Sequence, residues 1–220
     1  MANYDHDLGM RVHAYLNSLG LETPASFEGA NSLRLNPRRE PSIEGAIGDI
    51  LTDLNLDMSN DSLRETPHRV AKMYCQEIFY GLDYGNFPKC TTVNNGMIYT
   101  EMVCSTASVV SLCEHHLVPF QGSARVAYIP NKKVLGLSKI NRIVDFFSRR
   151  PQIQERLTMQ ICEALRFILE TENVAVIIRA EHLCVKLRGV KDQLSQTTTS
   201  KMGGKFMSNP TLRAEFLSIS

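Results

Sequence analysis

A change in residue pattern near Pro88 constrains the fold of this 220-residue chain more than any other feature. Before Pro88, apolar residues recur at the spacing of amphipathic helices. After it come short segments rich in β-branched and aromatic residues, which are typical of strands, with two helical patterns between them. This order predicts an α+β protein with an N-terminal helical region at residues 1–90 and a second, strand-containing domain at residues 91–220.

The N-terminal region is predicted to hold helices at about residues 8–19, 42–57 and 66–80. Gly20 follows the first pattern as a stop, and Ser42 stands where it could cap the second. Thr66 could cap the third helix, and Pro67 suits its first turn. The segment 22–41 contains three prolines and is predicted to be an irregular, solvated arm.

The second domain is predicted to place two consecutive helices between strands. Strands are expected within residues 97–110, 122–129 and 174–187, and at Thr197–Thr199. One helix is expected to start at Ser138 as its cap, and the next at Pro151, with apolar residues at i, i+4 steps. Within 174–187, alternation would put His182, Cys184 and Lys186 on one face of a strand.

Charge and composition exclude several classes of protein. The formal net charge is only +1, so the chain is not expected to bind nucleic acid through a general basic surface. No signal peptide or membrane span is predicted, because the longest purely aliphatic run is Val174–Ile178. The six cysteines are scattered through the chain, so we expect reduced thiols and a cytoplasmic protein.

Residues that prefer zinc gather in two short motifs. These are Cys113, Glu114, His115 and His116 in one tetrapeptide, and His182 and Cys184 farther along the chain. Thiolate and neutral imidazole are the preferred zinc donors, and the step from Cys113 to His116 lets two side chains meet one ion from a single turn. Cys184 is the best third ligand, which leaves the fourth tetrahedral position for water, as in catalytic zinc sites.

The spacing alone leaves several alternatives open. It does not distinguish which of the three histidines bind the metal, and a purely structural zinc is also compatible with it. A histidine left off the metal could carry protons. Glu114 could orient an imidazole or simply face solvent. Taken singly, each residue would be read as an ordinary core cysteine or surface histidine, but together they favour zinc.

Two further groups could recognise a substrate. Ser138, Lys139 and Arg142 lie at the start of a predicted helix, where free amides and the helix dipole favour anions, and Arg188 follows the last strand. Basic residues in such places are more often solvated surface. Gln154 and Glu155 together could read the donor-rich edge of a guanine-like ring, although an acidic residue in a first helical turn also suits the dipole.

Four motifs, in this order, resemble the GTP cyclohydrolase I family. They are Cys113–His116, Gly136–Arg142, Arg150–Thr158 and His182–Gly189. The resemblance continues more weakly through Thr66–Arg69 and Leu19–Pro24, so it spans most of the chain. Leu187 departs from the small residue that is common before the Arg-Gly pair, and the arm at 22–41 matches poorly.

The resemblance implies a role for each site residue. It implies that Cys113, His116 and Cys184 hold Zn²⁺, and that His115 and His182 handle protons. Glu155 and Gln154 would read the purine or pterin ring. The triphosphate and ribose would be contacted by Ser138, Lys139, Arg142 and Arg188, of which Ser138 is also expected to be catalytic. Arg69 would join them from a neighbouring subunit.

The resemblance also implies a fold and a reaction. The fold would be the tunnelling fold, an antiparallel four-stranded sheet with two helices on one face, assembled as a homodecamer of two stacked pentamers with sites at subunit interfaces. The enzyme would open GTP hydrolytically at C8, release formate and form 7,8-dihydroneopterin triphosphate, the first step of pterin and folate biosynthesis. The alternatives are a non-catalytic purine- or pterin-binding protein of this fold and a zinc nucleobase deaminase, whose H-x-E and P-C-x-x-C signature the chain lacks.

Overall fold

The computed structural model describes residues 4–24 and 39–219. Of the predicted arm at 22–41, residues 25–38 lie outside this described part. The centre of the molecule is a five-stranded sheet with the order β5-β2-β3-β6-β7. Its strands are β2 (Val103–Cys113), β3 (Pro119–Tyr128), β5 (Pro151–Gln152), β6 (Val174–His182) and β7 (Thr197–Met202).

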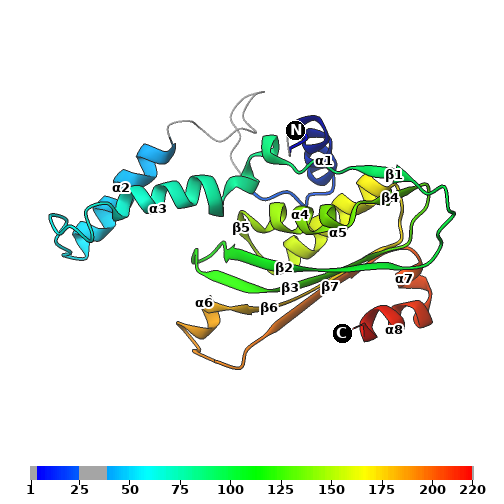
Figure 1. Ribbon diagram of the computed structural model, residues 1–220. Coiled ribbons are helices and arrows are strands. Elements are labelled where there is room, and N and C mark those ends of the chain that lie inside the picture. Colours follow the sequence, from blue (N-terminus) through cyan, green and yellow to red (C-terminus); the bar gives the residue numbers. More distant parts are fainter. Residues whose placement is uncertain (1–3, 25–38, 220) are drawn as a thin grey trace.

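The four long strands pair antiparallel, whereas the short edge strand β5 pairs in parallel with the end of β2. Two helices, α4 (Leu137–Ser148) and α5 (Gln154–Leu169), lie on one face of this sheet (Figure 1). This arrangement confirms the predicted α+β fold with two helices on one face. The prediction of four strands missed β5, which adds a fifth at the edge beside β2.

The main hydrophobic core lies between the sheet and helices α4 and α5. Val109 and Ile178 fill it from the strands, and Ile161 fills it from α5, all with no exposed surface. Helix α1 (His6–Ser18) packs on the outside of α5 and extends this core with two fully buried side chains, Val12 and Leu16. The predicted N-terminal helix at 8–19 is therefore confirmed and has its partner surface.

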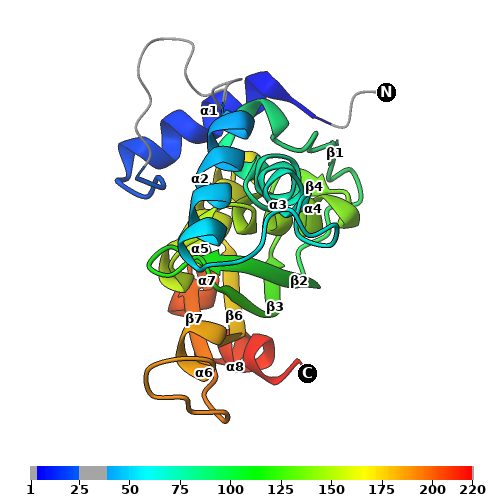
Figure 2. The ribbon, with the colours of Figure 1, turned by 90° about the vertical axis from the view of Figure 1, so that its left-hand side faces the viewer.

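Helices α2 (Arg39–Asp53) and α3 (Thr66–Met73) form a hairpin that projects away from the sheet (Figures 1 and 2). Residues of α2 pack against α3, yet no residue of α2 is buried. Ile50 and Leu54 of the predicted apolar stripe remain 54% and 64% exposed. The described part of this single chain therefore covers the stripe only in part.

The remaining elements are short. A π-helical turn (Tyr74–Ile78) and two 3₁₀ turns (Tyr80–Leu82 and Tyr84–Asn86) lead from α3 to β1 (Thr92–Asn94), which pairs with β4 (Lys133–Leu135). Helices α7 (Lys205–Ser208) and α8 (Pro210–Ser218) cover one end of the sheet face opposite α4 and α5 (Figure 1). No helix among residues 4–24 and 39–219 has the length and apolar character needed to cross a bilayer.

Three predicted helix starts are wrong in detail. Ser42 lies inside α2, which begins at Arg39. Thr66 is the first residue of α3 rather than its cap, and that helix ends at Met73 before the π-helical turn, not near residue 80. Ser138 lies within α4, whose N-cap is Gly136. Side-chain capping depends on the entering backbone, which helical periodicity does not fix.

Pro151 does not begin a helix. Pro151 and Gln152 form β5, and α5 starts at Gln154. Proline favours extended backbone in the residue before it and tolerates an edge strand, because it has no N–H to donate. The amide of Glu114 donates to the carbonyl of Gln152 (3.0 Å), which holds this short strand beside the end of β2.

The predicted strand at 174–187 is too long. β6 ends at His182, and Leu183–Lys186 form the short helix α6. His182 pairs with Phe120, and the next partner residue would be Pro119, which cannot donate a backbone hydrogen bond. His182, Cys184 and Lys186 therefore do not share a strand face as the alternating pattern suggested. Strand β7 confirms the strand predicted at Thr197–Thr199.

Candidate metal centre and active site

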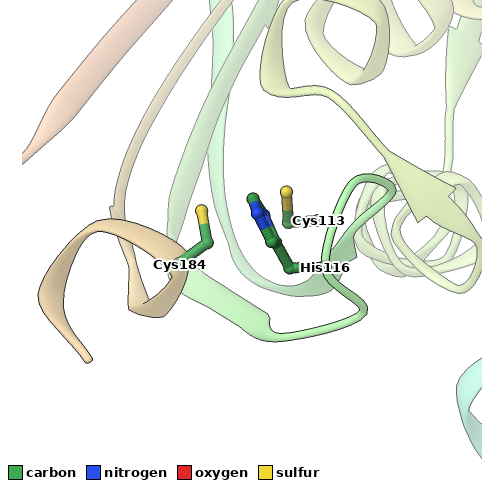
Figure 3. A group of neighbouring side chains, drawn as sticks. All are labelled: Cys113, His116 and Cys184. Carbon is green, nitrogen blue, oxygen red and sulfur yellow. The ribbon is translucent and has the colours of Figure 1, made fainter. Parts of the chain in front are cut away.

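Cys113, His116 and Cys184 converge at one end of the sheet. Cys113 ends β2, His116 lies in the turn between β2 and β3, and Cys184 lies in α6 (Figure 3). One ligand atom from each of these three residues lies within 4.8 Å of the other two. The three side chains point toward one another, although Cys184 lies far along the sequence from the other two.

A tight turn presents the first two of these side chains. The amide of Leu117 donates to the carbonyl of Cys113 (2.8 Å), and the amide of Cys113 donates to the carbonyl of Val118 (2.9 Å). Leu117 has a φ of 51°, a left-handed conformation that is uncommon for a leucine. The backbone therefore reverses within three residues, which brings Cys113 and His116 to the same side.

The donor set fits zinc. Two thiols and one imidazole are ligands that zinc prefers, and three protein ligands leave a fourth position for water or substrate. Burial, followed by the hydrogen bond and charge of Cys113, raises the pKa of the Cys184 thiol. A divalent cation bound by both thiols would offset this effect, because it favours the deprotonated form of a thiol ligand.

His115 and His182 lie beside these three residues without belonging to the group. Nδ1 of His115 lies 3.7 Å from Sγ of Cys113, and the His115 side chain is exposed. The His182 ring stacks on Phe120, with ring centres 4.6 Å apart. Burial lowers the pKa of His182, and the charge of Glu155 acts in the opposite direction. Burial thus favours the neutral imidazole, the form that accepts a proton.

Gln154 holds His182 from its edge. Nε2 of Gln154 has three acceptors within hydrogen-bond distance for its two N–H groups: the carbonyls of Ile178 (3.0 Å) and Thr197 (3.1 Å) and the hydroxyl of Thr199 (3.0 Å). These acceptors orient the amide so that its oxygen faces Nε2 of His182, 2.7 Å away. Gln154 is only 2% exposed, so its amide is engaged by the protein, whereas the neighbouring Glu155 is exposed.

The Glu114 carboxylate is paired with Arg156 and does not face solvent freely. Nη1 of Arg156 lies 2.7 Å from one of its carboxylate oxygens, and Nη2 lies 3.3 Å from the other. The hydrogen bond from Arg156 lowers the pKa of Glu114 against a smaller opposing effect of burial. Arg156 belongs to the first turn of α5, next to Gln154 and Glu155.

Ser138, Lys139 and Arg142 lie far from this metal centre. Asn141, in the same part of α4, lies against Ser105, with side-chain oxygens 3.4 Å apart. Because a strand rises about 3.3 Å per residue, the path along β2 from Ser105 to Cys113 spans about 26 Å. β4, which leads into α4, and α6 lie at opposite ends of the sheet (Figure 1).

The two remaining arginines are also placed differently from each other. Arg188 lies just after α6 and contacts His116, with Nη1 2.8 Å from Nε2 of the imidazole. Arg69 is exposed on α3, in the hairpin that projects away from the sheet (Figure 1). A single chain thus brings Arg188, Gln154 and Glu155 to the metal centre, but not the cations of α4.

Sequence reasoning missed two residues that shape the centre, Phe120 and Arg156. Phe120 is fully buried and supports the His182 ring, and Arg156 holds Glu114. Phe120 follows Pro119 at the start of a strand segment, which by itself suggests only core packing. Arg156 follows Gln154 and Glu155 in a first helical turn. Its place next to these two candidate site residues was the one feature of the sequence that could have indicated a role at the site.

Comparison with known proteins places the chain in a family. A family model described as GTP cyclohydrolase I matches residues 43–220. A GTP cyclohydrolase 1 of Shewanella sp. (strain MR-7) is 53% identical over 215 residues, which are 97% of this chain and 98% of the relative. Another, from Shewanella denitrificans, is 54% identical over 212 residues, or 96% of each chain.

A solved structure of the archaeosine synthase QueF-Like in the apo form aligns over 47% of this chain and 93% of its own. Its sequence identity is 17% and the TM-score is 0.39, so it adds nothing to the assignment. The family model covers most of the chain, and the relatives match it over nearly their whole length. The chain therefore belongs to the GTP cyclohydrolase I family.

Proposed function

We propose that this enzyme opens the imidazole ring of GTP by hydrolysis at C8, releases formate and closes the product to 7,8-dihydroneopterin triphosphate. The observation that carries this proposal is the convergence of Cys113, His116 and Cys184 beside two further histidines, His115 and His182. A binding protein would gain nothing from two proton carriers next to a metal, whereas two successive hydrolytic steps need them.

Cys113, His116 and Cys184 would hold the zinc ion. Water held by a zinc ion at these three residues would have a pKa of about 7 and would be available as a nucleophile at neutral pH. His115 and His182 would move protons to and from the imidazole nitrogens as the C–N bonds break. Burial lowers the pKa of His182 and so favours its neutral form, which can accept a proton, and Gln154 fixes the direction in which its ring faces.

Glu155 is our candidate for reading the guanine ring. Its carboxylate is exposed, and its charge reaches His182, so a base seated against it would also lie near the proton carrier. A carboxylate accepts hydrogen bonds from the ring N–H and the exocyclic amine of guanine. Arg188, on the other side of the centre, would contact the ribose or phosphates.

The site would be completed by another copy of the chain. Ser138, Lys139 and Arg142 could hold the triphosphate of a GTP molecule only if they came from a neighbouring subunit, because about 26 Å of strand separates them from the metal within one chain. Ser138 would thereby serve the catalytic step by positioning the substrate, and Arg69 of the projecting hairpin would reach a neighbouring site in the same way.

The edges of the sheet support assembly into a ring. β5 pairs with β2 only at Leu112 and Cys113, so residues 103–110 have no partner on that edge within the described chain. The outer edge of β7 likewise has no partner strand among the described residues. Unpaired edges at both ends allow head-to-tail pairing of copies, which closes into a ring when the rotation permits. We propose the decamer of two stacked pentamers that the family resemblance implies.

A direct assay tests this function. Purified, zinc-loaded oligomer should convert GTP to a product that gives fluorescent neopterin after iodine oxidation and phosphatase treatment, with one formate released per product. The Cys184→Ser variant serves as the control without a complete metal site. An oligomeric, zinc-loaded sample that binds GTP but forms neither product would contradict the proposal and favour a non-catalytic binding protein.

The cellular setting is proposed on the same grounds. All six cysteines are free, and a zinc site with two thiolates requires reduced thiols, as in the cytoplasm. GTP is the proposed substrate, and no nucleic-acid or membrane partner is proposed.

A further inference from the structure

The turn that carries two of the proposed zinc ligands is held by a side chain outside it. Arg156 grips both carboxylate oxygens of Glu114, the residue between Cys113 and His115, at 2.7 and 3.3 Å. The side chains of Arg156 and Glu114 are 14% and 23% exposed. Two parallel N–H···O bonds fix orientation as well as distance, and partial burial reduces screening by solvent.

Glu114 is fixed through its backbone too. Its amide donates to the carbonyl of Gln152 (3.0 Å), in the short strand just before α5. One side chain and one amide therefore attach the turn to the start of α5 at two points. Neither bond involves a zinc ligand directly, yet the residues on either side of Glu114 are Cys113 and His115.

The same turn of α5 also holds the opposite side of the centre. Gln154, two residues before Arg156, contacts Nε2 of His182 at 2.7 Å. His182 lies two residues before Cys184, the third proposed ligand. The first turn of α5 thus contacts both chain segments that supply ligands and could set their separation.

We propose that Arg156 is a positioning residue, which through Glu114 holds the Cys113–His116 turn in the geometry that binds zinc. Arg156 touches neither the metal nor the substrate in this role. It restricts the rotation of the turn, so that Cys113 and His116 are already oriented toward Cys184 before the metal binds. Groups that orient metal ligands in this indirect way contribute about 10- to 100-fold to metal affinity.

Zinc competition with a chromophoric chelator tests the proposal on the full-length oligomer. Arg156→Gln and Glu114→Gln should each weaken zinc binding about 10- to 100-fold. Because both substitutions remove the same ion pair, the double variant should bind zinc about as tightly as either single variant. Arg156→Lys, which keeps the charge but loses the paired bonds, should fall between wild type and Arg156→Gln.

Arg166→Gln is the matched control. Arg166 lies on the same helix and grips both oxygens of Glu163 at 2.7 and 2.9 Å, but far along α5 from the metal centre. The Arg166→Gln variant should have a lower unfolding temperature than wild type but the same zinc affinity. The proposal is overturned if Arg156→Gln binds zinc within about threefold of wild type, if Arg166→Gln weakens zinc equally, or if the losses of the two single variants add in the double variant.

The inference rests on the proposed zinc site but not on turnover of GTP. Metal affinity is measured without substrate, so an inactive protein that binds zinc would contradict the proposed function and leave the Arg156 test intact.

Discussion

His115 and His116 are adjacent, yet only His116 lies in the ligand group with Cys113 and Cys184. His115→Ala should therefore keep zinc and GTP affinity but lower kcat about 10²- to 10⁴-fold, the usual contribution of a general acid or base. Cys184→Ser should instead lose the metal, because a hydroxyl is a much poorer zinc donor than a thiolate. Metal content after gel filtration and single-turnover kinetics would check both, and the reverse pattern would contradict the assignment.

Gln154 was predicted to read the substrate ring, but its amide is already engaged by the protein. We expect Gln154→Ala to misorient His182 and to lower kcat by at least about tenfold, with little change in KM for GTP. Gln154→Glu, which keeps an acceptor beside His182, should lose less. A raised KM with unchanged kcat would instead assign the amide to ring recognition, as the sequence suggested.

Residue chemistry predicted a zinc site that includes Cys113 and Cys184, and the family resemblance chose His116 among the three histidines. The elements that bring these residues together differ from the prediction. The step from Cys113 to His116 in one turn is confirmed. Cys184 reaches the same point from α6, although the alternating pattern had placed it on a strand face. Arg156 could not be foreseen, because the sequence does not show that the start of α5 packs against the turn after β2.

Among the elements, α1 is fastened to the sheet layer by a buried ion pair. Glu22, just after α1, accepts hydrogen bonds from Arg150 (3.1 Å) and Tyr84 (2.5 Å), and its carboxylate lies 2.9 Å from Nδ1 of His13. Arg150 is 1% exposed, and its guanidinium lies over the ring of Phe146. The first residue of the predicted solvated arm is thus part of the core.

Glu22→Ala should lower the free energy of unfolding by about 3 kcal/mol, because it leaves the buried Arg150 charge without its partner. Burial alone would raise the pKa of Glu22, but the hydrogen bond of His13, the charge of Arg150 and the hydroxyl of Tyr84 together lower it. The stabilisation is therefore complete above the unfolded value of about 4.5 and is lost as the pH falls through the lower pKa of the folded protein.

Chemical denaturation of wild type and Glu22→Ala between pH 3 and 8 would measure this difference. It should be constant near neutral pH and shrink below about pH 4.5. Glu65→Ala is the control, since Glu65 and Arg64 form an exposed pair with a 3.8 Å contact that contributes little. A difference that does not change with pH would mean that packing, and not the charge of Glu22, is responsible.

A second prediction at this scale concerns Gly122 in β3. A Cβ atom built there would lie 2.0 Å from the carbonyl oxygen of Arg179 in the neighbouring β6. Gly122→Ala should therefore destabilise the protein by about 1–3 kcal/mol, the usual cost of overpacking. Gly96→Ala, where a Cβ would meet nothing within 4 Å, should have almost no effect in the same denaturation experiment.

Helical periodicity predicted α1, α4 and α5, because each buries one apolar face. It did not predict β5 or the end of β6, because these depend on which strand lies alongside. The prediction that a helix begins at Pro151 was wrong for the same reason, since a proline suits both a first helical turn and an edge strand.

For the whole molecule, the separation of the α4 cations from the metal centre gives a test of the composite site. Cys184→Ser and the double variant Lys139→Ala, Arg142→Ala should each be inactive alone. When the two variants are unfolded together and reassembled, activity should return. In an equal mixture about one site in four then combines intact metal ligands from one copy with intact α4 cations from another. Mixing without reassembly is the control, and no recovery after reassembly would contradict a site shared between copies.

No sequence pattern could give this separation. Ser138, Lys139 and Arg142 stand between the two metal motifs in the chain, which suggests closeness to both. The direction of α4, which starts beside β4 and runs toward β5, decides where they lie. The exposed side chains of Ile50 and Leu54 belong to the same scale, because the described part of the chain leaves more than half of each uncovered.

The metal ligands and the α4 cations lie at opposite ends of each chain, and this placement has a consequence for inheritance. With a shared site, each copy serves one site with its metal ligands and another with its α4 cations. A copy defective in both halves would silence two sites rather than one. A cell that makes normal and defective chains together would therefore lose more activity than the share of defective chains, and a mutant allele of this gene would act as partly dominant even when the normal allele is expressed fully.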